Sequence, residues 1–311
     1  MSVITIRNLV KNYGKIRAVD NLNINIDEGN CVGLLGPNGA GKTTTIKILC
    51  GVLRPTRGKA FINGINVTKH PERALKHVGA IVERPEIYSC LTAREFLAYM
   101  GRLRGMNPGV LERRIKEVLG LVGLSEQIDM KVGKFSTGMK QRLIIAQAIL
   151  HEPEVLLLDE PLQGLDPKGI VEMRELIKRL HRNGCTILFA SHILSEVQEI
   201  CNKVAVIDKG KLLLYGDIDR LAELSGARSV EIKALHPLDD HILDEIKRKN
   251  YVISVRRQNS DSAIVSLRGN DHQLADLLEF LVEELRIKLT SFAPSEKILE
   301  EVYLKLVKEV S

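Results

Sequence analysis

The chain has 311 residues, of which 44% are hydrophobic and 27% are charged, so it is expected to be globular, and disordered and fibrous classes are excluded. The net charge is +6, but residues 221–311 hold only 13 Lys and Arg against 16 Asp and Glu, so the positive excess lies in residues 1–220. This change of sign indicates two units, the first suited to an anionic ligand although it lacks the basic runs of a nucleic-acid binder.

Short apolar runs bounded by Gly and Pro predict the strands of the first unit. Runs of four or five apolar residues without polar alternation are typical of strands that are buried on both faces of a parallel or mixed sheet. Helical patterns separate these runs, so the predicted fold class is α/β. The predicted strands are 3–6, 31–35, 155–159, 186–190 and 204–207.

Strand signals stop between residues 85 and 150, and helical patterns replace them. A T-x-x-E capping box at residues 92–95 opens a helix that ends at Gly105, and Pro108 starts a second helix. A third helix is expected over about residues 138–150. The sequence therefore predicts a helical subdomain inserted between two segments of the sheet.

The pattern changes again beyond about residue 220. Strands are predicted at 230–234, 251–257, 262–268 and 285–292, with helices at 237–249 and 271–284 and a last helix at 294–308. The order β-α-β-β-α-β indicates a split β-α-β sandwich. Residues 221–311 are therefore expected to form a small α+β domain of ferredoxin-like type, and residues 1–220 a separate α/β domain.

A phosphate-binding loop is the strongest chemical motif. Residues 36–44 read GPNGAGKTT and match G-x-x-x-x-G-K-[ST] between a predicted strand and a predicted helix. The glycines let backbone N–H groups converge, Lys42 reaches the β- and γ-phosphates, and the hydroxyl of Thr43 is placed for Mg²⁺. The residues expected to contact ATP are Gly36, Pro37, Asn38, Gly39, Ala40, Gly41, Lys42, Thr43 and Thr44.

Two carboxylates follow the buried run at residues 155–159. Asp159 at the strand end can hold Mg²⁺, and Glu160 can orient or deprotonate the attacking water. An Asp-Glu pair after a strand is by itself most often a solvated turn. Its occurrence together with the phosphate loop favours the catalytic interpretation.

The segment KFSTGMKQRL contains a second candidate anion site. Ser136 and Gly138 present a hydroxyl and bare N–H groups at the start of a predicted helix. Taken alone, this pattern is most often a Ser N-cap followed by a glycine. Because one nucleotide needs only one phosphate loop, a second site suggests that a partner chain supplies the nucleotide.

These motifs together resemble the ATP-binding-cassette (ABC) ATPases. The phosphate loop, the Ser-x-Gly segment, LDEP at 158–161, GLDP at 164–167 and SH at 191–192 stand in the order and spacing of that family. The resemblance covers residues 1 to about 220. It implies a P-loop NTPase core with a mixed sheet and a helical subdomain at about residues 85–150.

The resemblance also implies a head-to-tail dimer in which each ATP lies between two chains. The signature residues Ser136, Thr137 and Gly138 would then contact the ATP bound by the opposite chain. Asp166 would line the dimer contact, His192 would bond the γ-phosphate and hold the water with Glu160, and Tyr13 would stack on adenine. Taken alone, both His192 and Tyr13 are more typical of packing residues.

Two departures from the family pattern are visible. The signature reads FSTGM rather than LSGGQ, but Ser136 and the second glycine are kept. Glu83 stands where the family usually has a Gln that touches Mg²⁺ or the water. A glutamate at this position resembles exporters of the bacitracin- and lantibiotic-resistance type. Neutral drift is the alternative; if the glutamate matters, Glu83→Gln is expected to keep ATP binding and to change coupling to transport.

The C-terminal segment resembles the extension of the daunorubicin-resistance branch of these ATPases. PSEKILEEVYLKLV at 294–307 is similar to that branch's closing motif, PSLEDVFLKLT. An amphipathic closing helix without a site and a dimerising or regulatory domain are both open interpretations.

The expected function is the nucleotide-binding subunit of an ABC transporter that hydrolyses ATP to export an antibiotic, peptide or lipid-like cargo. Expected partners are a second copy of the chain and separately encoded integral membrane permease subunits, with no nucleic acid. ATP and Mg²⁺ are the expected cofactors. The predicted catalytic residues are Glu160, His192 and Lys42, and the predicted metal ligands are Thr43, Glu83 and Asp159.

The expected location is cytoplasmic, peripheral on the inner face of the cell membrane. The chain has no apolar run of membrane-spanning length and no signal-peptide pattern, and five scattered cysteines indicate a reducing compartment. Two alternatives remain: a soluble ABC ATPase acting on nucleic acid or the ribosome, and a regulatory ATP sensor with negligible turnover. The single cassette and the absence of a basic arm argue against the first.

Overall fold

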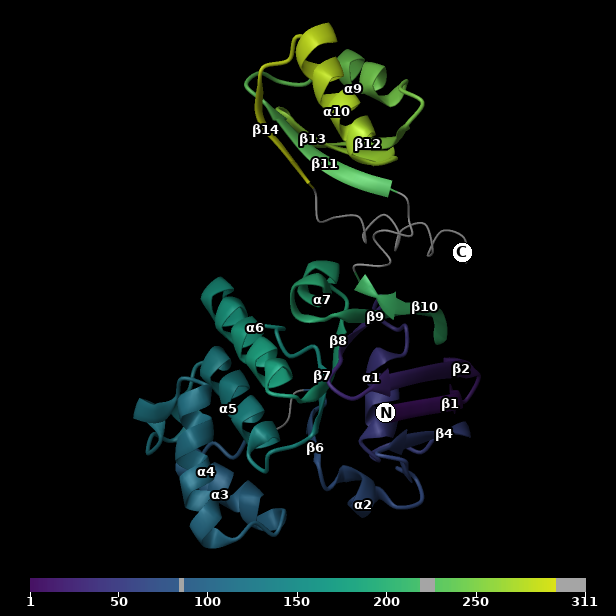
Figure 1. Cartoon of the computed structure of the whole chain (residues 1–311). Coiled ribbons are helices and arrows are strands. Elements are labelled where there is room, and N and C mark those ends of the chain that lie inside the picture. Colours follow the sequence, from purple (N-terminus) through teal and green to yellow (C-terminus); the bar gives the residue numbers. More distant parts are fainter. Residues whose placement is uncertain (84–86, 219–226, 295–311) are drawn as a thin grey trace. The chain divides into compact units, whose positions relative to one another are not determined.

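The computed structural model describes residues 1–83, 87–218 and 227–294 (Figure 1). Contacts between residues divide the chain into two compact units, Met1–Gly216 and Asp217–Ser311, and each is described by itself. The last helix expected from the sequence, at 294–308, falls outside the described residues.

A six-stranded sheet forms the centre of the first unit. Its strand order is β10-β9-β3-β8-β7-β6, and the pairs from β9 through β6 are parallel. Every residue of β3, β7 and β8 is buried, as expected from runs without polar alternation. The carboxyl ends of these parallel strands lie at one edge. The strands are β3 (Cys31–Leu35), β6 (Val78–Ile81), β7 (Val155–Asp159), β8 (Thr186–Ser191), β9 (Lys203–Asp208) and β10 (Lys211–Asp217).

A second, antiparallel sheet has the order β2-β1-β4-β5. One core cluster unites residues of both sheets with α1 (Lys42–Leu49), whose Ile46, Ile48 and Leu49 are fully buried. α1 therefore packs between the sheets, and the loop before it is held by both. The remaining elements here are β1 (Ser2–Tyr13), β2 (Ile16–Asp27), β4 (Arg57–Ile62), β5 (Ile65–Asn66) and α2 (Pro71–Leu75).

Three helices form the predicted helical subdomain: α3 (Ala93–Leu103), α4 (Pro108–Leu121) and α5 (Thr137–Ile149). The capping box of α3 is confirmed, since Thr92 accepts from the Glu95 amide and the Glu95 carboxylate accepts from the Thr92 amide. Two further helices, α6 (Pro167–Arg182) and α7 (Leu194–Ile200), follow β7 and β8. Among the described residues, no helix is both long and apolar enough to cross a bilayer.

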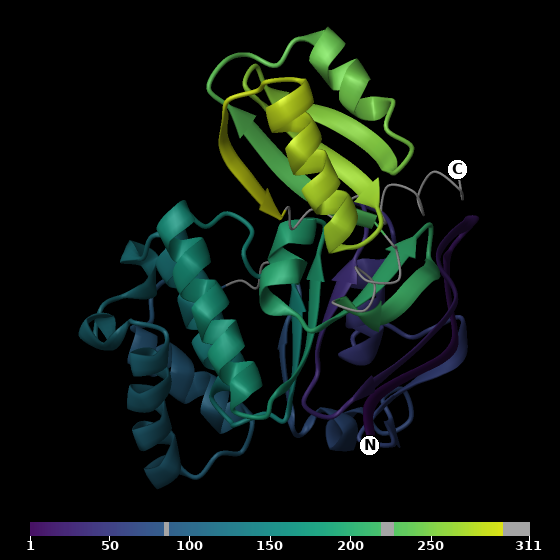
Figure 2. The same ribbon diagram turned by 45° about the horizontal axis from the view of Figure 1, so that its top comes forward.

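The second unit is a four-stranded antiparallel sheet with two helices packed on it. Its strand order is β12-β13-β11-β14, with α9 against β12 and α10 against β13 (Figure 2). The predicted helix at 271–284 ends as a π turn at Phe280–Glu284, and the strand predicted from 285 begins only at Leu289. The elements are β11 (Ala227–Ala234), α9 (Asp240–Lys247), β12 (Val252–Asn259), β13 (Ser262–Arg268), α10 (Asp271–Glu279) and β14 (Leu289–Pro294).

All five cysteines are free, and their environments differ. Cys31 and Cys201 are buried, and Cys50 and Cys185 are partly buried. Cys90 is exposed, in the turn that precedes α3.

Candidate nucleotide-binding and hydrolysis site

The phosphate loop joins the carboxyl end of β3 to α1. Gly39 and Gly41 have φ angles of 84° and 103°, which side chains other than hydrogen rarely permit. A Cβ at Gly36 would lie 2.3 Å from the carbonyl oxygen of Ile207 on β9. The sheet therefore lies close against the loop at Gly36 and leaves no room for a side chain there, whereas Gly39 is required for its backbone angle.

Lys42 lies at the centre of the loop. Its Nζ donates to the carbonyl oxygens of Gly36 at 2.8 Å and Pro37 at 3.2 Å, and it lies 3.5 Å from Oε1 of Glu160. The side chain is only 6% exposed. A buried ammonium group beside a carboxylate is thus in place to meet the phosphates of a nucleotide.

Asp159 and Thr43 fit a Mg²⁺ ion. Asp159 is buried, and its Oδ1 atom has no hydrogen-bond partner among the described residues. Burial raises the pKa of this carboxyl, while hydrogen bonding from the Thr43 side chain and the charge of Lys42 oppose that shift. A buried carboxylate oxygen without a partner, next to a hydroxyl, is a donor set that suits Mg²⁺.

The third group of the site is a pair formed by Glu160 and His192. Nδ1 of His192 lies 3.0 Å and 2.9 Å from the two carboxylate oxygens of Glu160. β7 and β8 are adjacent parallel strands, so the residues that follow them meet at the same edge. Glu160 has a φ of 47°, and its amide donates to the Ala190 carbonyl at 3.0 Å, which fixes the turn that carries the carboxylate.

A buried hydrogen bond between Ser191 and Glu196, which the motifs did not predict, supports this pair. The Ser191 hydroxyl donates to Oε2 of Glu196 at 2.6 Å and accepts from the Ile193 amide at 3.0 Å. Ser191 and Glu196 are both buried, and burial raises the pKa of the Glu196 carboxyl. The network anchors the segment that carries His192. The S-H-x-x-x-E spacing was the available signal.

Glu83 follows β6 and has a partner that the sequence analysis also missed. Its Oε1 lies 2.5 Å from Nζ of Lys47 on α1, so the carboxylate is engaged by an ammonium group. No local pattern in the sequence indicated this contact, because the two residues are 36 positions apart.

The signature segment lies at the start of another helix. Ser136 is the N-cap of α5 and accepts from the Met139 amide at 3.2 Å, and Asp166 is the N-cap of α6 and accepts from the Gly169 amide at 3.1 Å. Ser136 and Thr137 are exposed. Within the described parts of the chain, no hydrogen bond joins either N-cap to Lys42 or Glu160.

Tyr13 ends β1 and is 46% exposed. The Nζ atom of Lys11 lies 5.2 Å from the centre of its ring, a cation–π distance. An exposed aromatic ring is thus available to a planar ligand, while the contact with Lys11 orients it.

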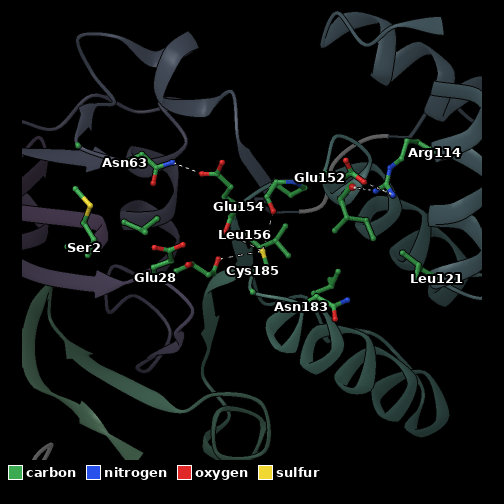
Figure 3. Close-up of a pocket in the computed structure, with 18 of the residues that line it drawn as sticks. Ser2, Glu28, Asn63, Arg114, Leu121, Glu152, Glu154, Leu156, Asn183 and Cys185 are labelled. Atoms are coloured by element: carbon green, nitrogen blue, oxygen red, sulfur yellow. Dashed lines mark hydrogen bonds and ion pairs between the residues drawn. The ribbon is translucent and has the colours of Figure 1, made fainter. Parts of the chain in front are cut away.

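A well-formed cavity lies elsewhere in the described part of the chain. It has a volume of about 680 Å³, and Figure 3 shows its walls, which include Arg114 of α4, Glu154 and Cys185. Glu154 and Cys185 directly precede β7 and β8, so this cavity opens at the amino edge of the parallel sheet. The predicted site residues lie at the carboxyl edge, and the cavity contains none of them.

Comparison with known proteins identifies the family. A family model described as "ABC transporter" matches residues 19–163. The chain is 39% identical over 307 residues to the bacitracin transport ATP-binding protein BcrA of Bacillus licheniformis, covering 98% of this chain and 97% of that protein.

Solved structures agree. The ATP-binding subunit of an ABC transporter matches with a TM-score of 0.66 and 31% identity, over 72% of this chain and 94% of that one. A dimeric bacterial ABC transporter cassette matches with a TM-score of 0.63 and 25% identity, over 69% and 98%. The resemblance drawn from the motifs is confirmed, and the chain belongs to the ABC transporter family, as an ATPase subunit that uses ATP and Mg²⁺.

Proposed function

We propose that this chain powers an exporter from the inner face of the cell membrane, as a head-to-tail homodimer bound to separately encoded membrane subunits. Its similarity to a bacitracin transport ATP-binding protein extends over nearly the whole of both chains. That supports a peptide antibiotic, or a molecule of similar amphipathic chemistry, as the cargo.

In the proposed reaction, the chain's own residues prepare the γ-phosphate for attack by water. Lys42 and the loop amides neutralise the phosphate charge, while Thr43 and Asp159 hold Mg²⁺, which adds electrostatic stabilisation of the phosphates when bound. Glu160 accepts the proton of the attacking water, and His192 orients the Glu160 carboxylate.

The opposite chain completes the site in this proposal. Ser136 and Gly138 at the N-terminus of α5 donate to the γ-phosphate across the dimer, with Asp166 beside them and Tyr13 against the adenine. The exposure of Ser136 and Thr137 supports this arrangement, because exposed N–H groups at a helix start suit an anion that arrives from outside the chain.

The observation that carries the proposal is the contact between Glu160 and His192 beside Lys42. A carboxylate at 2.9–3.0 Å from an imidazole and 3.5 Å from a buried ammonium is oriented at two points. A site that binds nucleotide without hydrolysing it does not need a general base fixed in this way. The geometry favours turnover over an ATP sensor.

The test is a capture experiment with Glu160→Gln in the native cell. The amide keeps the shape of the carboxylate but cannot take a proton, so the tagged chain is expected to remain ATP-bound and associated with its partners. Membranes are solubilised gently, and the proteins retained with ATP are compared with those retained with ADP, with the unaltered chain as control.

Recovery of a polytopic membrane protein with ATP supports the exporter. Recovery of ribosomes or nucleic acid instead contradicts it and favours the soluble ABC ATPase.

A further inference from the structure

An ion pair beside the nucleotide site joins α1 to the segment after β6. Nζ of Lys47 lies 2.5 Å from Oε1 of Glu83. Lys47 is four residues after Thr43 on α1, so the two side chains lie on one face of the helix, one turn apart. The ion pair therefore starts one helical turn from the hydroxyl that is placed for Mg²⁺.

The backbone of Glu83 is held at the same site. Its peptide group lies beside Asp159 and acts to lower the pKa of the Asp159 carboxyl, against the larger effect of burial. Glu83 also has a φ of 57°, a conformation that residues other than glycine rarely adopt. Glu83 thus has its peptide beside Asp159 and its carboxylate bound to Lys47.

The negative charge of Glu83 calls for a positively charged partner near the nucleotide site. A carboxylate at this position adds negative charge near the phosphates of ATP, and the ammonium of Lys47 offsets it. The Lys47 side chain is 26% exposed and the Glu83 side chain 62% exposed, so the pair is accessible to water and can exchange partners.

We propose that Lys47 is a positioning residue that holds the Glu83 carboxylate on α1, so that a divalent cation must displace Lys47 before Glu83 can coordinate it. The inference rests on the proposed function and deepens it. Glu83 can then coordinate a metal ion only after its carboxylate leaves Lys47, and the strength of the ion pair sets how readily this happens.

The test measures divalent-cation binding, with Mn²⁺ as a paramagnetic probe. The full chain carries Glu160→Gln to prevent turnover and is saturated with ATP, and the Mn²⁺ concentration at half-saturation is read from the signal of free Mn²⁺. Lys47→Met, Glu83→Gln and the double variant are compared with this parent.

Lys47→Met is expected to lower the half-saturating Mn²⁺ concentration by about two- to fivefold, the range of an exposed ion pair. In the Glu83→Gln background the same substitution is expected to change nothing, because no carboxylate is released. Lys59→Met is the matched control, since it removes an equal charge from an exposed position on β4.

An equal shift in both backgrounds would mean that Lys47 acts only through its long-range field, and it would overturn the proposal. Absence of any shift would overturn it as well.

A second readout needs no nucleotide. In urea unfolding of the apo chains, Lys47→Met and Glu83→Gln are each expected to lower the midpoint, and the double variant to lower it no further than the more severe single change. Additive losses would show that the ion pair does not form. If the parent itself fails to bind ATP and Mn²⁺, the proposed function fails, while this apo measurement still decides the ion pair.

Discussion

At the scale of single residues, Glu160 and His192 act as one unit. Their contact of 2.9–3.0 Å predicts that the two substitutions are not additive. Glu160→Gln is expected to reduce the ATPase rate by about 10²–10⁴-fold, as for loss of a general base, without loss of ATP binding. His192→Ala is expected to slow hydrolysis too, and the double variant to be no slower than Glu160→Gln alone.

Steady-state phosphate release measures this prediction, with ATP affinity measured separately by equilibrium binding. Hydrolysis by Glu160→Gln at the unaltered rate would remove Glu160 from its assigned role. Multiplying losses in the double variant would show that His192 acts independently of Glu160.

The motifs predicted the positions of Lys42, Asp159 and Glu160, because the loop and the strand end are local patterns. They could not predict that Lys47 binds Glu83, since the two are 36 positions apart and only the tertiary fold brings them together. The Ser191–Glu196 contact is different, because it spans only five positions and its S-H-x-x-x-E spacing was an available signal. Local spacing shows which side chains share a face, but contacts between elements depend on the tertiary fold.

At the scale of elements, the capping box of α3 has a measurable effect. Thr92→Ala removes the hydroxyl that accepts from the Glu95 amide at 3.2 Å and is expected to lower the free energy of unfolding by about 1 kcal/mol. Urea unfolding measures the change, and Thr68→Ala, at an exposed position, is the control. An equal loss in both variants would contradict a specific role for the cap.

His151 follows α5 and makes stability depend on pH. Its Nε2 lies 3.1 Å from the carbonyl oxygen of Val78 and 2.9 Å from Nη1 of Arg104. Burial, and then the charge of Arg104, lowers the pKa of His151 from 6.5 to about 4. Because the folded chain resists protonation there, the stability contributed by the neutral ring is present above pH 6.5 and is lost as the pH falls towards 4.

The expected loss is roughly 1–2 kcal/mol after allowance for partial exposure. His151→Gln is expected to flatten this part of the pH dependence, measured as the midpoint of thermal unfolding at a series of pH values. An unchanged slope between pH 6.5 and 4 would show that other groups control it.

The sequence predicted elements unevenly. β3, β7 and β8 were recognisable because all their residues are buried, and α3 because its capping box is explicit. Most of the antiparallel sheet of the first unit, β2-β1-β4-β5, was not predicted from the sequence. Its strand β2 reads IRAVDNLNINID and combines alternating burial with polar residues typical of turns. Its register depends on pairing with β1, which no local pattern encodes.

At the scale of the whole molecule, every residue of the candidate site lies in the first unit. The phosphate loop, both carboxylates, His192 and the Lys47–Glu83 pair all fall within Met1–Gly216. A chain of residues 1–216 is therefore expected to fold and to bind ATP with the affinity of the full chain. Circular dichroism and equilibrium binding measure this, and loss of ATP binding by a folded fragment would show that the second unit contributes to the site.

The lysine at the centre of the phosphate loop has a consequence for the heat and speed of nucleotide binding. With its ammonium bonded to the loop's own carbonyl groups, Lys42 helps to keep the loop in shape. An incoming phosphate exchanges one set of hydrogen bonds for another and orders little new backbone. Association is therefore expected to be rapid and driven by enthalpy, with a small heat-capacity change.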